Sequence, residues 1–209
     1  MTPLPFLNFI HKPKNELEKG GRTAALVQED ASEPEKTCPN CHKSIPLSRL
    51  WSNWNTCACG YHFRMGGRQR LRFLADKGSF QELFSQVEGR DPLSFPGYRE
   101  KLEMVRDASS EKEAVLCGTA RIGGCLFIME PYFMMGSMGT AVGEKITSLF
   151  EYATEHSLPV VGYTVSGGAR MQEGLLSLMQ MAKTSGAVKR HSDAGLFYCT
   201  VLTDPTTGG

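Results

Sequence analysis

The stretch LPVVGYTVSGGARMQEG, residues 158–174, decides the fold of this 209-residue chain. It begins with strand-forming residues up to Ser166, continues through two adjacent glycines, and enters a helix-like pattern at Ala169. Gly167 and Gly168 remove side chains where the backbone turns, so another group can approach the main chain closely there. The stretch therefore predicts a buried strand, a glycine turn and a long helix, a unit typical of α/β proteins.

Strand and helix patterns alternate on both sides of this turn. Residues 114–133, AVLCGTARIGGCLFIMEPYF, contain two strand patterns joined by a Gly-Gly turn, which predicts a hairpin. We expect helices over 143–157 and 169–195 and a buried strand over 195–203. This order predicts an α/β domain at 113–209 in which each strand leads into a loop at its carboxyl end.

The first 112 residues differ in character from this domain. Residues 1–36 are rich in charge and poor in apolar positions, so we expect a disordered tail. Residues 37–64 hold four clustered cysteines and form a separate small unit. Residues 65–112 are expected to be a helical connector, with a helix at 67–77 that resumes over 79–88.

The composition is that of an ordinary soluble protein. The chain is 41% hydrophobic and 22% charged, with a formal net charge of +1, which disfavours bulk affinity for nucleic acid. Its apolar runs are shorter than the roughly 20 residues of a membrane span, and its start lacks a secretory pattern. We therefore expect a cytoplasmic protein without a membrane partner.

The clustered cysteines are typical of a structural metal site in a reducing compartment. They read Cys-x2-Cys, then 15 residues, then Cys-x-Cys, which is nearly the spacing of a zinc ribbon. Four thiolates would hold one structural Zn²⁺ and leave no open position for catalysis. Because the second pair is one residue short, His42 or His62 is an alternative ligand, and loss of the metal is another possibility. The candidate ligands are Cys38, Cys41, Cys57 and Cys59.

A basic segment follows the cysteines. FRMGGRQRLRF carries four arginines with no acid between them: Arg64, Arg68, Arg70 and Arg72. Such a segment can contact a nucleotide phosphate or nucleic acid, or it can be a solvated helix face.

Three glycine-bearing loops, at 134–139, 166–170 and 206–209, are expected at the carboxyl ends of strands. Backbone N–H groups in such a loop, helped by the dipole of a following helix, can bind a phosphate or stabilise a developing oxyanion. The nucleotide-binding glycine patterns are missing from the sequence, and these loops carry neither His nor Cys. Main-chain electrostatics are therefore the candidate chemistry, while a purely steric role of the glycines is the simpler alternative.

Several motifs, taken in order, resemble the carboxyltransferase β subunit of bacterial acetyl-CoA carboxylase. They are CPNC…CACGYHFR, DPLSF, MMGSMGTAVGE, SGGARMQEG, LMQMAKTS and VLTDPTTGG, and the resemblance runs over residues 37–209. It implies a crotonase-like fold of ββα units after an N-terminal zinc ribbon. It also implies transfer of a carboxyl group from carboxybiotin to acetyl-CoA, giving malonyl-CoA in the first committed step of fatty acid biosynthesis.

The resemblance assigns roles to the glycine loops. Gly167 and Gly168 would form one oxyanion hole and Gly208 and Gly209 another, for the enolate and the biotin ureido oxygen in an order left open. Four further residues would contact substrate: Ser166, Arg170, Gly136 and Gly139. For Arg170, ordering of its own loop is the alternative role. Six methionines are expected mainly in the core: Met134, Met135, Met138, Met171, Met179 and Met181.

The resemblance also implies partners. They are a carboxyltransferase α subunit in an α2β2 assembly, the biotin carboxyl carrier protein, and a biotin carboxylase that consumes ATP, so ATP is not expected here. The family continues beyond TTGG at 206–209, so the domain is expected to be incomplete. A nucleic-acid-binding module built on the ribbon is the alternative function.

Overall fold

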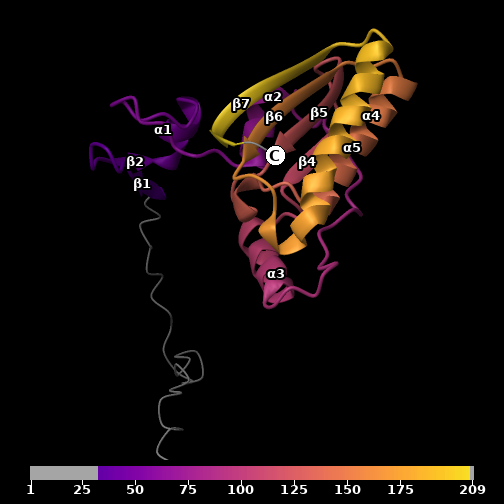
Figure 1. The fold of residues 1–209 in the computed structure, drawn as a ribbon. Coiled ribbons are helices and arrows are strands. Elements are labelled where there is room, and N and C mark those ends of the chain that lie inside the picture. The colour runs from indigo at the N-terminus through magenta and orange to yellow at the C-terminus, as the bar shows by residue number, and fades with distance from the viewer. Residues whose placement is uncertain (1–32, 208–209) are drawn as a thin grey trace, which may run out of the picture.

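The computed structural model describes residues 33–207, and Figure 1 shows a small N-terminal unit beside a larger α/β domain. The tail expected over 1–36 lies outside the described residues except for its last four positions. Two of these four belong to β1 (Glu35–Thr37).

The α/β domain is organised around one five-stranded sheet of order β3-β4-β5-β6-β7. The first three strands pair antiparallel, and β5, β6 and β7 pair parallel. Two helices make the parallel crossovers, α4 (Thr140–Glu155) and α5 (Gly174–Asp193). The carboxyl ends of the parallel strands therefore lie at one edge of the sheet. The strands are β3 (Gln81–Leu83), β4 (Val115–Ala120), β5 (Gly124–Met129), β6 (Val160–Ser166) and β7 (Tyr198–Thr206).

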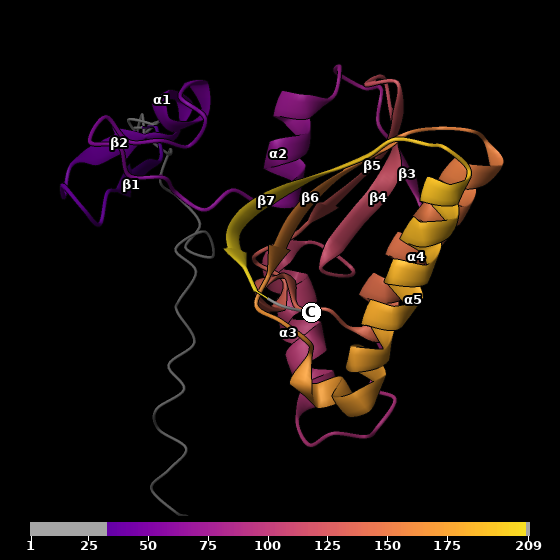
Figure 2. The same cartoon turned by 45° about the horizontal axis from the view of Figure 1, so that its top comes forward.

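Helices cover both faces of the central strands (Figure 2). α4 and α5 lie together on one face, and α2 (Gly67–Leu74) lies on the other. Phe127 of β5 points toward the α4 face, where it joins Val142 and Phe150 in the main core. All six residues of β5 are buried, which explains why its sequence, GCLFIM, is an unbroken apolar run rather than an alternating one.

The hairpin, the helix α4 and the strand β6 occur near the positions that the sequence predicts, whereas α5 starts five residues later than predicted. The strand predicted over 195–203 forms as β7, but the prediction that it is buried is wrong, because within the described residues β7 is an edge strand with no buried residue. The helix predicted over 79–88 is also wrong. That segment contains β3, whose Leu83 lies opposite Cys117 of β4. The strand pairs the outer backbone groups of β4, which would otherwise be an open sheet edge. The connector at 65–112 thus supplies a strand to the sheet in addition to α2 and α3 (Tyr98–Ser109).

The N-terminal unit consists of a β1–β2 hairpin and α1 (Leu47–Ser52), with β2 at Ser44–Pro46. It contacts the domain through Trp54, which stacks on Phe73 of α2 with ring centroids 4.7 Å apart. Asn55 and Gln69 also exchange side-chain hydrogen bonds of 2.9 and 3.4 Å.

The prediction that the six methionines are mainly core residues is wrong for four of them. Met138 is buried and Met134 packs against the core. The four exposed ones are Met135, Met171, Met179 and Met181, and Met171 has 82% of its surface accessible. Three of the four lie in α5 or the turn before it, because in the described part of the chain α5 packs mainly on α4 and leaves its other faces open.

Candidate functional site

The glycine loops at 134–139 and 166–170 meet at the carboxyl edge of the parallel strands, as the sequence predicts, and the described start of the third loop, at Thr207, joins them there. The Gly167 amide donates to the carbonyl oxygen of Met135 at 2.9 Å, and Met138 forms a parallel bridge with Ala169. The Thr207 amide donates to the carbonyl oxygen of Ser166 at 3.0 Å. The end of β6 is therefore held between the loop that follows β5 and the end of β7.

The expectation that Gly167 and Gly168 leave their amides bare is wrong. Gly167 donates to Met135, as described above, and the Gly168 amide donates to the Ser166 hydroxyl oxygen at 3.0 Å. Within residues 33–207 the half-buried Ala169 amide has no hydrogen-bond acceptor. Gly208 and Gly209 lie outside the described residues. The donor that sequence reasoning missed is thus one residue beyond the glycine pair.

The helix after this turn also begins later than predicted. Residues 167–170 are not helical and contain a bend at Gly168, Met171–Glu173 form a short 3-10 turn (η4), and α5 starts at Gly174, whose φ is +51°. The helix N-terminus within the site is that of α4, and its Thr140 amide donates to Glu173 Oε2 at 2.5 Å. A protein carboxylate, rather than a ligand, therefore occupies this helix end.

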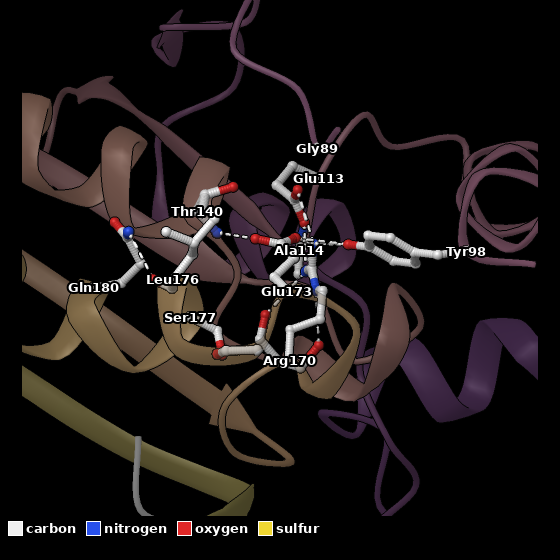
Figure 3. A network of polar contacts seen from close by, with 12 residues as sticks. Gly89, Tyr98, Glu113, Ala114, Thr140, Arg170, Glu173, Leu176, Ser177 and Gln180 are labelled. Atoms are coloured by element: carbon white, nitrogen blue, oxygen red, sulfur yellow. Dashed lines mark hydrogen bonds and ion pairs between the residues drawn. The ribbon is translucent and has the colours of Figure 1, made fainter. Parts of the chain in front are cut away.

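Arg170 is the centre of a buried polar cluster (Figure 3). Its guanidinium, with no accessible surface, contacts Glu113 Oε1 at 2.6 Å and Glu173 Oε1 at 3.3 Å. It also donates to the Ser137 carbonyl at 2.9 Å, while the Tyr98 hydroxyl donates to Glu173 at 2.6 Å. Burial alone would lower the pKa of Arg170, but Glu113 outweighs it and the pKa lies above its ordinary value.

The cluster holds two carboxylates for one guanidinium, so other donors stabilise the excess negative charge. The Ala114 amide donates to Glu113 at 2.7 Å, and the Thr140 amide adds the positive end of the α4 dipole beside Glu173. Burial raises the pKa of the Tyr98 phenol, which keeps it a donor. Sequence reasoning missed Tyr98, Glu113 and Glu173; the one available signal was Glu173 three residues after Arg170.

The buried position of Arg170 corrects its predicted contact with substrate and supports the loop-ordering alternative. Two predicted ligand glycines are likewise buried. A Cβ on Gly136 would collide with the Val165 carbonyl, and one on Gly139 would lie 2.7 Å from the Arg170 guanidinium. The steric explanation therefore accounts for both. Ser166 lines the end of an apolar cavity of about 500 Å³ between the sheet and α4 and α5.

The four cysteines form the second candidate site. All four Sγ atoms lie within 4.8 Å of one another, with Cys38–Cys59 at 3.7 Å and Cys41–Cys57 at 3.6 Å. A tetrahedral site with Zn–S bonds of about 2.3 Å needs sulfurs about 3.8 Å apart. The Asn40 side chain donates to Cys59 and lowers the pKa of that thiol to about 6, whereas burial and the neighbouring thiols raise the pKa of Cys57 to about 12.

The shortened Cys-x-Cys pair thus brings its sulfurs to the cluster without a substitute. His62 bonds to the Thr56 hydroxyl at 3.1 Å, and no histidine within residues 33–207 joins the four thiols. These residues can bind a metal ion.

Within residues 33–207, no helix has the length and apolar character needed to cross a bilayer.

Comparisons with known proteins identify the family of this chain. A family model described as "Carboxyl transferase domain" matches residues 64–209. The acetyl-coenzyme A carboxylase carboxyl transferase subunit beta of Ruminiclostridium cellulolyticum is 55% identical over 176 residues, which cover 82% of this chain. The chain spans 61% of the length of that relative.

Similar solved structures include one that reaches a TM-score of 0.50 and supports the fold. The geranyl-CoA carboxylase beta subunit of P. aeruginosa has a TM-score of 0.50 and 23% identity, over 66% of this chain and 24% of that one. A transcarboxylase 12S structure with hydrolysed methylmalonyl-coenzyme A bound has a TM-score of 0.49 and 25% identity, over 68% of this chain and 24% of that one.

Proposed function

This chain belongs to the carboxyl transferase family, and on that premise we propose that it is the β component of an acetyl-CoA carboxyltransferase. Its α/β domain has the crotonase-like fold that the sequence predicts. The relative with 55% identity supports acetyl-CoA as the substrate, although this chain spans only 61% of that relative. The reaction proposed is transfer of a carboxyl group from carboxybiotin to acetyl-CoA, giving malonyl-CoA for fatty acid synthesis.

The observation that carries this proposal is the meeting of three backbone turns at one edge of the sheet, with a half-buried amide left for a ligand. Carboxyl transfer needs an enolate of the acyl thioester. In the reaction, carboxybiotin releases carbon dioxide, and the freed biotin nitrogen takes a proton from the acetyl methyl carbon. The resulting enolate carbon then forms the new bond to carbon dioxide. Two N–H donors aimed at the enolate oxygen stabilise it by several kcal/mol when water is excluded.

We assign the donor role in this turn to Gly168 and Ala169. The Gly168 amide is held by a hydroxyl, and rotation of the Ser166 side chain releases it without moving the backbone. The Ala169 amide has no acceptor among the described residues, so it can donate to a ligand directly. Gly208 and Gly209, which follow β7, are proposed for the second oxyanion hole, for the biotin ureido oxygen, while the turn after β6 serves the enolate.

The Arg170 cluster gives the turns their fixed positions. Arg170 follows the two donor residues directly and also contacts Ser137 in the neighbouring loop. The donors are therefore attached to a buried ion-pair network rather than to a flexible loop, which is the preorganisation that oxyanion stabilisation requires. The four thiolates are proposed to hold one structural Zn²⁺, which folds the small N-terminal unit.

The proposed partners follow from the reaction. A carboxyltransferase α subunit would complete an α2β2 enzyme, and a biotin carboxyl carrier protein would deliver carboxybiotin. A separate biotin carboxylase would consume the ATP. The chain, completed to the length of its relatives and combined with an α subunit, should form carboxybiotin and acetyl-CoA from malonyl-CoA and biotin. A well-folded complex that performs no transfer in either direction would refute the proposal.

A further inference from the structure

The four arginines that follow the cysteines have different surroundings. Arg68 is neutralised by Glu111 at 2.8 Å and Glu82 at 2.8 Å. Arg72 lies on the exposed side of α2. Arg64 and Arg70 line a cleft and form no ion pair with the carboxylates of residues 33–207. The basic segment therefore directs two cations toward one place.

That place is a cleft of about 370 Å³ between the cysteine unit and the carboxyl ends of β6 and β7. Its volume lies within the range of small-molecule sites. Arg70 extends from α2, and its guanidinium lies 5.5 Å from the Tyr163 ring centroid. Asp204 is the one carboxylate in the lining, so the cleft has an excess of positive charge.

An aromatic side chain forms another wall of the cleft. Trp54 stacks on Phe73 with one ring face and keeps 61% of its surface accessible. A fixed indole with an accessible face can accept a planar base, and such stacking tolerates different bases. His62 lies in the same lining. Cations beside an aromatic platform are a combination suited to a phosphorylated nucleoside.

The cleft also reaches the end of β6, next to the glycine turns. Val165 belongs to its lining and directly precedes Ser166. The Val165 carbonyl lies against Gly136 of the neighbouring loop, so that Gly136 has no room for a side chain. A ligand anchored in the cleft can therefore extend toward the turns along the end of β6.

We propose that this cleft binds the phosphorylated adenosine of the coenzyme A thioester, with Arg64 and Arg70 on the phosphates and Trp54 against the base. This inference rests on the proposed function, since it takes the ligand to be the acyl-CoA substrate. It separates the two ends of that substrate: the nucleotide lies between the cysteine unit and the sheet, and the thioester lies at the turns.

The test uses Trp54 as its own reporter. The chain has two tryptophans, and Trp51 is outside the cleft lining, so a Trp51→Phe chain isolates the Trp54 fluorescence. Titration with adenosine 3′,5′-bisphosphate and with coenzyme A should quench it. In that background Arg70→Gln and Arg64→Gln should each weaken binding about tenfold, because each removes a charge-assisted hydrogen bond. Arg72→Gln, the same substitution on the exposed side of α2, should leave the dissociation constant unchanged.

The outcomes separate this inference from the proposed function. Equal dissociation constants for the Arg70, Arg64 and Arg72 variants would refute binding of the nucleotide in this cleft. An unchanged KM for acetyl-CoA in the Arg70 and Arg64 variants of an enzyme that transfers carboxyl groups would refute it as well. Arginine-dependent binding of the bisphosphate by an enzyme that transfers no carboxyl group would support the nucleotide site and refute the proposed carboxyltransferase function. Tighter, strongly salt-dependent binding of a random RNA oligomer at the same arginines would replace the nucleotide by nucleic acid.

Discussion

Replacing Arg170 by glutamine tests whether the buried ion pairs hold the glycine turns in place. The change leaves Glu113 and Glu173 in a site with no accessible surface and no cation. Removing one partner of a buried ion pair costs about 3–5 kcal/mol of unfolding free energy, because the remaining charge is both desolvated and unpaired. With a urea m-value of about 2.5 kcal/mol/M, the unfolding midpoint should fall by about 1–2 M.

Arg190→Gln is the matched control. Arg190 pairs with Glu151 at 2.8 Å, but both side chains are more than half exposed. A surface pair of this kind contributes about 0–1 kcal/mol, so the midpoint should move by less than about 0.4 M. Hydrogen exchange gives a second measurement: the Gly167 amide should exchange faster only when Arg170 is replaced, since its acceptor lies in the loop that Arg170 holds. Equal midpoints and equal exchange for the two variants would refute the reasoning.

Three further changes probe other parts of the molecule. Cys38→Ser, or a strong chelator, should abolish binding of one zinc per chain and unfold the N-terminal unit, as followed by metal analysis and circular dichroism. Met135→Gly should stabilise the chain by up to about 1 kcal/mol in urea unfolding, because Met135 has a φ of +57°, whereas Met104→Gly in the middle of α3 should destabilise it by about 1 kcal/mol. Burial raises the pKa of Glu130, so the native state binds its proton more readily than the unfolded chain does, and stability falls as pH rises above about 4.3 toward the raised value. Glu130→Gln should remove that slope from urea midpoints measured across pH 4–7, while the exposed Glu155→Gln should keep it.

The sequence predicted those strands and helices in which one hydrophobic pattern continues over several residues. The unbroken apolar run of β5 is typical of a strand buried on both faces, and the glycine pair that follows β6 marks a close backbone contact. β3 was missed because three residues are too few to show a period, and its strand form depends on pairing with β4. The late start of α5 was missed because it too depends on long-range contacts. Glu173, in the turn before α5, accepts hydrogen bonds from Thr140 and Tyr98, which are distant in the sequence.

The candidate site was only partly predictable. The sequence located the turns, but it could not show that the Met135 carbonyl accepts from Gly167, because that bond joins residues 32 positions apart. The partners of Arg170 come from α3, the segment just before β4, and η4, a combination that only the folded chain assembles. The cysteine cluster, in contrast, was predictable from the sequence. The spacing of four thiols indicates a metal site even when the second pair is one residue short.

The central claim is that backbone amides in the turn after β6 stabilise the enolate, and Gly168→Ala tests it most directly. Gly168 has a φ of +109°, so a side chain there shifts the backbone that carries both donor amides. Gly195→Ala is the control, because Gly195 also has a positive φ, +74°, but lies in open space after α5. In the assembled enzyme, kcat for carboxyl transfer should fall about 10²–10³-fold in the Gly168 variant and stay within about twofold in the Gly195 variant. Equal kcat values for the two folded variants would contradict the account.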